Sequence, residues 1–367
     1  MNGEPRNSDQ PLDETPPSAL HVMPGVSDVP SLNPYVAEQR KFQKKRIYTP
    51  EELAEGILSG NRTLLSKAIT LVESNREDHN EIAQSILEKV LPSSGKSIRI
   101  GITGVPGVGK STFIEGFGNH ILSLGRKLAV LAIDPSSQLT HGSILGDKTR
   151  MESLAKSENA FIRPSPSSGS LGGVARKTRE SIYLCEAAGF DTIIIETVGV
   201  GQSETQVHSM VDFFLLLMLA GAGDELQGIK RGIMEMADLI AINKADGKNE
   251  PYATRAKAEY ESALHLFPPA ASGWMPRAVT CSGQYGKGID EIWNLALDYQ
   301  RHTTKSGYFQ KNREEQITLW FRETLKEAIL DQFLEREGMR DRIHLAESKI
   351  GQGKSSVIQE IKGLLKT

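Results

Sequence analysis

The stretch that decides the fold is Ile98-Arg99-Ile100-Gly101-Ile102-Thr103-Gly104-Val105-Pro106-Gly107-Val108-Gly109-Lys110-Ser111-Thr112. It opens on a short apolar strand pattern, and a helical pattern follows it from Ser111 to Leu124. Between the two, Gly104 to Ser111 satisfies GxxxxGK[ST] in the strand–loop–helix context that this motif requires. The sequence therefore predicts a phosphate-binding loop at the start of an α/β domain.

This loop has the chemistry to hold a nucleoside triphosphate. Its glycines permit positive φ, so successive backbone N–H groups can turn inward around phosphate oxygens. Lys110 is expected to reach the β- and γ-phosphates, and the Ser111 hydroxyl is expected to bind Mg²⁺. The positive end of the following helix adds to the attraction. The expected nucleotide contacts here are Gly104, Val105, Pro106, Gly107, Val108, Gly109, Lys110, Ser111 and Thr112.

A second motif indicates the base. Asn243-Lys244-Ala245-Asp246 follows the apolar run Leu239 to Ile242 and matches the NKxD pattern of GTPases. The Asp246 carboxylate can accept hydrogen bonds from guanine N1–H and N2, whereas adenine would leave it unpaired. Asn243 is expected to tie this loop to the phosphate loop, and the Lys244 stem to cover the base. Ser282, Gly283 and Gln284 are in place for a second base-contacting loop, although Ser-Gly turns are common elsewhere.

A carboxylate follows another strand. Ile193 to Ile195 leads into Glu196-Thr197-Val198-Gly199, where most small GTPases carry DxxG. Glu196 can serve Mg²⁺ directly or through water, and the Gly199 N–H can bind the γ-phosphate. Val200 stands where Ras-like proteins place their water-orienting Gln, and Gln202 is out of register. We therefore expect slow intrinsic hydrolysis, and no general base is assignable.

Three further charged residues are candidates for the site. Asp134 follows the strand Val130 to Ile133, from which it can face the metal and the nucleotide. Asp147 lies in a Gly/Ser-rich stretch, where charges are more often solvated loop decoration. Lys230 lies in the glycine-dense segment 221–232, which suits a loop that rearranges but equally an ordinary surface loop.

The rest of the chain divides into regions that differ in composition and hydrophobic pattern. Apolar strand runs at 127–133, 192–195, 213–218, 239–242 and 278–281 alternate with helical stretches, which predicts a mostly parallel sheet with helices on both faces. We expect a disordered Pro-rich tail over 1–45, with a partner-binding arm as the alternative. A helical N-terminal subdomain over 46–95, capped at Thr49, precedes a G domain over 96–300 and a helical C-terminal arm over 301–367.

Composition excludes several classes of protein. With 43 Lys and Arg against 46 Asp and Glu, the formal charge is −3, too little positive charge for a general nucleic-acid binder. Cys185 and Cys281 form no ligand-spaced cluster, so no disulfide framework or thiolate metal site is expected. The longest apolar run, Phe213 to Ala222, is too short to span a membrane, and the N-terminus lacks a signal sequence. We expect a cytoplasmic protein.

The motifs taken together resemble one family. GVPGVGKST, DPSS, GSILGDKTRM, RPSPSSGSLGG, ETVGVGQSE, AGAGDELQGIKRGI and NKAD, in this order, are similar to the methylmalonyl-CoA mutase-associated GTPases (MeaB, MMAA and ArgK), of the SIMIBI class of P-loop GTPases. The resemblance covers about residues 46–340. It implies a homodimeric G-protein chaperone of an adenosylcobalamin-dependent acyl-CoA mutase, which gates cofactor loading and protects or reactivates the mutase. A cobalamin adenosyltransferase is a further candidate partner.

The resemblance also implies roles for individual residues. Asp134, Asp147 and Glu196 take the positions of the family's metal and switch carboxylates, with Ser111, Asp134 and Glu196 at Mg²⁺. Lys230 falls in the partner-responsive third switch. His141 departs from the family pattern, where relatives usually have Gly. No DxHxxG occurs, so cobalamin is expected on the partner and not on this chain.

Two rival functions fit the sequence less well. A GTP-dependent metallochaperone would need Cys/His clusters, which the sequence lacks. An ATP-dependent kinase or transport-coupling protein is opposed by NKAD and by the absence of a membrane-spanning run. The residues alone do not decide the role of one apolar helical face, formed by Trp320, Phe321, Leu325 and Phe333. This face suits a core or a dimer interface equally. The resemblance favours the dimer interface.

Overall fold

The computed structural model describes residues 46, 48–133, 151–165, 171–197, 203–221 and 231–366. The elements below belong to the unit Tyr48–Thr367, which is separate from Met1–Ile47. The predictions made for the tail over 1–45 and for Asp134, His141, Asp147, Gly199 and Lys230 concern residues outside the described ranges.

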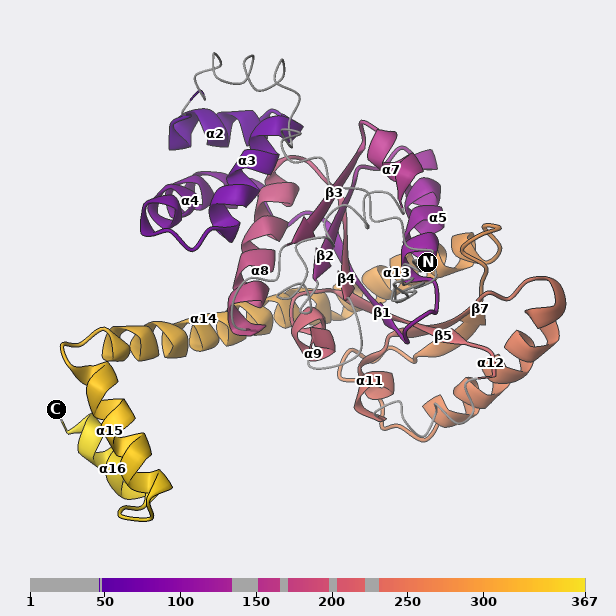
Figure 1. The fold of residues 1–367 in the computed structure, drawn as a ribbon. Coiled ribbons are helices and arrows are strands. Elements are labelled where there is room, and N and C mark those ends of the chain that lie inside the picture. The colour runs from indigo at the N-terminus through magenta and orange to yellow at the C-terminus, as the bar shows by residue number, and fades with distance from the viewer. Residues whose placement is uncertain are drawn as a thin grey trace, which may run out of the picture. The chain divides into compact units, whose positions relative to one another are not determined.

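A seven-stranded parallel sheet forms the centre of the fold (Figure 1). Its strands are β1 (Ile98–Gly104), β2 (Leu128–Ile133), β3 (Ala160–Ser165), β4 (Thr192–Thr197), β5 (Phe213–Leu219), β6 (Leu239–Asn243) and β7 (Arg277–Thr280). Their order is β3-β2-β4-β1-β5-β6-β7, and every neighbouring pair is parallel. The predicted fold class is confirmed, with β1 and its loop at the middle of the sheet.

One strand was not predicted. β3 contains Pro164, whose missing N–H cannot contribute to a ladder on both sides. The strand tolerates it because β3 lies at the edge of the sheet and pairs only with β2. The sequence signal failed because a short run with a proline does not resemble an interior strand.

Helices precede, cover and follow the sheet. On the N-terminal side lie α2 (Pro50–Leu58), α3 (Arg62–Glu73), α4 (Glu77–Val90) and the short η1 (Leu91–Ser93). Between strands lie α5 (Lys110–Ser123), α7 (Glu152–Lys156), α8 (Leu171–Ala187), α9 (Ser203–His208), α11 (Arg231–Met236), η2 (Gly247–Asn249) and α12 (Glu250–Leu264). After β7 come α13 (Ile289–Ser306), α14 (Tyr308–Leu334), α15 (Met339–Gly351) and α16 (Val357–Leu365). No helix within the described ranges is long and apolar enough to cross a membrane.

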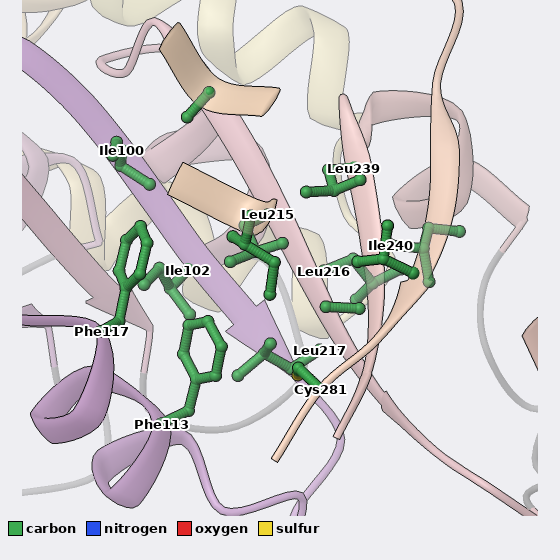
Figure 2. Packing of buried hydrophobic residues seen from close by; sticks show 14 of the residues in the cluster. Ile100, Ile102, Phe113, Phe117, Leu215, Leu216, Leu217, Leu239, Ile240 and Cys281 are labelled. Carbon is green, nitrogen blue, oxygen red and sulfur yellow. The ribbon is translucent and has the colours of Figure 1, made fainter. Parts of the chain in front are cut away.

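Each face of the sheet carries its own apolar core. Alternate strand residues point to opposite faces, so Ile100 and Ile102 join the core beneath α5, α12 and α13. Figure 2 shows Phe113 and Phe117 of α5 on this side, next to Ile102, and their rings stack with centroids 5.4 Å apart. This packing fixes α5, and with it the loop that leads into the helix, against the central strand.

The opposite core includes the N-terminal helices. Side chains of α2, α3 and α4 share one cluster with α8, β2 and β4. α2 begins at the predicted capping box, in which the Thr49 hydroxyl accepts from Glu52 N at 3.2 Å and Thr49 N donates to the Glu52 carboxylate at 3.0 Å. These helices therefore cover the α8 side of the sheet.

α14 is anchored by a buried ion pair. The Arg313 guanidinium donates to both carboxylate oxygens of Asp212 at 2.8 and 2.7 Å. It also donates to the carbonyls of Gly95 at 2.6 Å and Ser97 at 2.7 Å. Asp212 accepts a further bond from Arg99 N at 2.8 Å. The start of α14 is thereby fixed to the amino ends of β1 and β5.

The apolar face predicted on the C-terminal helix divides between two environments. Trp320 lies against Tyr183 of α8, with ring centroids 6.0 Å apart. Phe321 is 63% exposed and Leu325 44% exposed. α15 lies within the helical arm expected over 301–367 and packs against α16.

Candidate functional site

The phosphate loop runs from the carboxyl end of β1 into α5. Gly107 and Gly109 adopt φ of 76° and 88°, in the left-handed region that side chains disfavour. Gly104 allows a close approach to β5, since a Cβ there would lie 2.5 Å from the Leu217 carbonyl oxygen. The glycine spacing thus serves both backbone curvature and the packing of β1 on β5.

Lys110 sits at the first position of α5 and turns back over the loop. Its ammonium donates to the Gly104 carbonyl at 2.9 Å. Burial lowers the pKa of Lys110, whereas the carboxylates of Glu196 and Glu204 act to raise it. The lysine is therefore partly buried at the end of the central strands, where two carboxylates favour its charged form.

Asn243 joins three segments that are distant in sequence. The side chain, 3% exposed, donates from Nδ2 to the Val108 carbonyl at 2.8 Å. Its Oδ1 accepts from the Gly283 N–H at 3.0 Å. The predicted link between the NKAD segment and the phosphate loop is present, and it extends to the Ser282-Gly283-Gln284 loop.

Lys244 makes a second link to the phosphate loop. Its ammonium donates to the Gly107 carbonyl at 2.8 Å. Among the described residues it is the one non-glycine with positive φ, 59°. A left-handed conformation costs a non-glycine residue about 1–2 kcal/mol. The surrounding hydrogen bonds hold this strained geometry at the end of β6, as often occurs at functional sites.

Asp246 is held in place by the loop after β7. The Ser282 hydroxyl, fully buried, donates to Asp246 Oδ2 at 2.5 Å. Ser282 is itself fixed by its N–H, which donates to the Lys287 carbonyl at 2.9 Å, and its hydroxyl accepts from Tyr285 N at 3.3 Å. One carboxylate oxygen of Asp246 is thus oriented by Ser282, although a Ser-Gly pair is only a weak indication of a base-contacting loop.

Two glycines set the distance between α5 and this loop. A Cβ on Gly116 would lie 2.6 Å from the Gly283 carbonyl oxygen, and a Cβ on Gly283 would lie 2.6 Å from the Phe113 Cα. The backbones therefore touch directly. Any side chain at either position would push the Ser282 loop away from Asp246.

Glu196 lies on β4, the strand next to β1, near the phosphate loop. It is the penultimate residue of β4, in register with Ile102 of β1, and is 4% exposed. The next residue, Thr197, donates its hydroxyl to Thr103 on β1 at 2.8 Å. β4 and β1 are thereby bonded at the level of the loop, next to the buried carboxylate of Glu196.

Glu204 was not identified as a site residue from the sequence. It lies in the first turn of α9 and is fully buried, and its charge acts on Lys110. The residue is part of the ETVGVGQSE string, but no spacing rule distinguishes it from the solvated acids that begin many helices.

The described residues include oxygen ligands of the kind that Mg²⁺ prefers. Mg²⁺ takes oxygen ligands and is usually bound through one or two protein groups together with substrate phosphates. Ser111 and Glu196 supply a hydroxyl and a buried carboxylate from α5 and β4. Within the described ranges, no group of three or more His, Cys, Asp or Glu side chains gathers as a self-contained metal site.

The fold and this arrangement together define a class. A central parallel sheet, a GxxxxGKS loop between β1 and α5, and an NKAD segment bonded to that loop are the features of a P-loop GTPase. The sequence matches the protein family described as "Methylmalonyl Co-A mutase-associated GTPase MeaB" over residues 65–338. The chain belongs to this family.

Individual relatives agree with this assignment. The chain is 50% identical over 288 residues to "GTPase ArgK" of Escherichia coli, covering 78% of this chain and 87% of that protein. It is 46% identical over 313 residues to "Methylmalonic aciduria type A homolog, mitochondrial" of Mus musculus, covering 83% and 75%. The crystal structure of a protein titled "LAO/AO transport system kinase" superposes with a TM-score of 0.71 at 38% identity, covering 88% and 99%.

Proposed function

We propose that this chain binds and hydrolyses GTP with Mg²⁺ and uses its nucleotide state to control an adenosylcobalamin-dependent acyl-CoA mutase. In this role it gates loading of the cofactor and protects or reactivates the mutase. The observation that carries the proposal is Asp246, oriented by buried Ser282 and joined through Asn243 to the phosphate loop. Membership of the mutase-associated family supports the choice of partner.

The base preference follows from the hydrogen-bonding capacity of Asp246. Its carboxylate accepts only, and guanine presents two donors on one edge where adenine presents none in that arrangement. Ser282 occupies one oxygen and limits the carboxylate to a single orientation. A site built to receive donors rejects a ligand that lacks them by several orders of magnitude. ATP should therefore bind far more weakly than GTP.

Hydrolysis would use water as the nucleophile, with the protein supplying position and charge. Backbone N–H groups from Gly104 to Thr112 would surround the phosphates, and Lys110 would neutralise charge on the transferring phosphoryl group. Ser111 and Glu196, together with Asp134, are the residues that would hold Mg²⁺. The metal, when bound, stabilises negative charge on the phosphate oxygens. Gly199, Asp147 and Lys230 are proposed as nucleotide-sensing and partner-responsive residues of the switch segments.

The C-terminal helices are proposed as the homodimer interface. α14 exposes Ile317, Phe321, Leu325 and Ile329 at 51%, 63%, 44% and 58%. On α16, Val357, Ile358, Ile361 and Leu365 are 46–67% exposed. Apolar surface of this extent along two helices typically marks a protein interface. A cytoplasmic location and a cobalamin adenosyltransferase as a further partner complete the proposal.

A competition experiment tests the nucleotide assignment. Displacement of a fluorescent GTP analogue from the full chain should require at least about a hundred times more ATP than GTP. The Asp246→Asn variant places an amide donor where an acceptor is needed, so GTP affinity should fall about a hundredfold while the melting temperature stays close to that of the wild type. Equal displacement by ATP and GTP would refute the guanine assignment.

A reconstitution experiment tests the partner. The purified chain would be mixed with an adenosylcobalamin-dependent acyl-CoA mutase, and complex formation measured by size-exclusion chromatography with GTP, with GDP and without nucleotide. We expect a complex whose cofactor uptake depends on the nucleotide. Absence of binding in all three states would refute the chaperone role without affecting the GTPase assignment.

A further inference from the structure

Three aspartates of the sheet repeat one arrangement. Asp191, Asp212 and Asp238 stand directly before β4, β5 and β6. The N–H of each donates to the carbonyl of a residue at the amino end of the neighbouring strand. The N–H of that same residue donates back to Oδ2 of the aspartate, so the three carboxylates hold equivalent positions at one edge of the sheet. The partner residues are Lys127, Arg99 and Phe214, with N–Oδ2 distances of 3.2, 2.8 and 2.8 Å.

Two of these aspartates also accept from an arginine of this chain. Arg126 Nε donates to Asp191 Oδ1 at 2.8 Å, and Arg313 Nε donates to Asp212 Oδ1 at 2.8 Å. Asp238 differs, because within the described ranges it forms no ion pair and the side chain that hydrogen-bonds to it is the neutral hydroxyl of Tyr299. A carboxylate removed from water favours a partner of opposite charge. The arrangement at Asp238 therefore matches the other two except for the cation.

A cavity lies beside Asp238. Its volume is about 810 Å³, and Asp238, Trp274 and Tyr308 are among the residues that line it. Pockets of roughly 300–1,000 Å³ are typical of small-molecule sites. Phe214 of β5 and Arg277 of β7 also line the cavity, which places it at the amino ends of these strands. The phosphate loop and the NKAD segment follow the carboxyl ends of β1 and β6, so the cavity is at the opposite edge of the sheet from the nucleotide site.

The walls of the cavity suit a cation with an apolar body. The Trp274 ring is fixed by its Nε1–H, which donates to the Asp238 carbonyl at 3.0 Å, and by edge-to-face contact with Tyr299 at 5.5 Å. Aromatic faces attract ammonium and guanidinium groups, and the Arg277 guanidinium lies 5.8 Å from the Trp274 ring centroid. The carboxylate of Glu235 also lines the cavity. An anionic ligand would be repelled by both acids, whereas a cation is attracted by the acids and by the aromatic faces.

We propose that the cavity beside Asp238 binds a small organic cation, whose ammonium or guanidinium group pairs with Asp238 and whose apolar frame lies against Trp274. The charged group would take the place that Arg126 and Arg313 hold at the two equivalent aspartates. This site is separate from the nucleotide site and does not depend on the proposed function. Tyr308, the first residue of α14, lines the cavity, so the ligand would contact the helix that carries the proposed dimer interface.

Matched probes test the charge preference. Isothermal titration of the full chain would compare phenethylamine with phenethyl alcohol, its neutral analogue, and with phenylacetate, an anion of similar size. The titrations are made at about pH 8, where the Asp238 carboxylate is mostly ionised because burial raises its pKa to about 7. We expect phenethylamine to bind with a Kd of about 1 mM or tighter. The alcohol should bind at least about tenfold more weakly, since a hydrogen bond to a charged group contributes more than one between neutral groups, and phenylacetate more weakly still.

Two variants locate the binding. Asp238→Asn keeps an acceptor for the Phe214 N–H, now 2.8 Å from Oδ2, but removes the charge, so phenethylamine should lose its advantage over phenethyl alcohol. Asp331→Asn removes an acid at an exposed position of α14 and should leave that advantage unchanged. Absence of binding of the amine to the wild type, or equal affinities for the amine and the alcohol, would overturn the inference whether or not Asp238→Asn folds. The same preference in Asp238→Asn would overturn it as well. None of these results bears on the GTPase assignment, which the competition of GTP with ATP tests separately.

Discussion

Replacement of Asn243 by Ala tests the idea that one side chain assembles the site. The variant would leave two buried backbone groups without their partner, the Val108 carbonyl, now 2.8 Å from Nδ2, and the Gly283 N–H, now 3.0 Å from Oδ1. Each unsatisfied buried group costs about 1–3 kcal/mol. Allowing for some relaxation of the loops, we expect a loss of about 3 kcal/mol in the free energy of unfolding, or roughly 6–9 °C in melting temperature.

The assay for Asn243→Ala combines thermal unfolding with nucleotide titration. Because both loops contact the nucleotide in the proposed site, GTP affinity should fall by at least about tenfold. Asn243→Asp keeps the acceptor for Gly283 and loses only the donor to Val108, so its stability should lie between the wild type and Asn243→Ala. Asn249→Ala, at an exposed position without a side-chain cap, is the control and should change neither quantity. A melting temperature of Asn243→Ala equal to that of the wild type would refute the reasoning.

Two further predictions concern the opposite end of the sheet. Arg313→Ala leaves the Asp212 carboxylate buried without its main partner, so the free energy of unfolding measured in urea should fall by about 3–5 kcal/mol. Lys311→Ala, at an exposed position of the same helix, is the control and should leave it unchanged. A loss below about 1 kcal/mol in Arg313→Ala would contradict the anchoring role. Burial raises the pKa of Asp238 from 3.8 to about 7. Between these two pH values the native state therefore binds more protons than the unfolded state, so stability decreases as pH rises. The free energy of unfolding should fall by roughly 2–4 kcal/mol from pH 4 to pH 7, measured relative to Asp238→Asn. A pH-independent difference between the two proteins would refute this.

The nucleotide site was predictable because local motifs define it, whereas the tertiary contacts that support it were not predictable. The loop from Gly104 to Ser111 and the NKAD segment each require neighbouring residues in a fixed order, so the sequence alone locates them. The role of Gly283 as partner of both Asn243 and Phe113 depends on two other elements packing against it, and a Ser-Gly pair gives no sign of that.

The sheet shows the same division. Long apolar runs predicted the interior strands because burial on both faces demands them. β3, with Pro164, is permitted only by its edge position, which the local sequence does not reveal. Arg313 resembles the other charged residues of a long helix, and its burial follows from where α14 crosses the amino ends of β1 and β5. Glu204 was missed for the same reason.

The bonds of Asn243 have a consequence for synthesis of the chain. The phosphate loop is complete in sequence once Thr112 has been made, yet it is supported by Asn243, which lies 135 positions after its partner Val108. Asn243 is in turn fixed by Gly283, 40 positions further on. Chains grow from the N-terminus at about 5–20 residues per second, so the loop emerges from the ribosome well before its support. A nascent chain that stops short of Gly283 has the complete phosphate signature but no finished pocket. Tight binding of nucleotide is therefore expected only after translation has passed the end of the sheet.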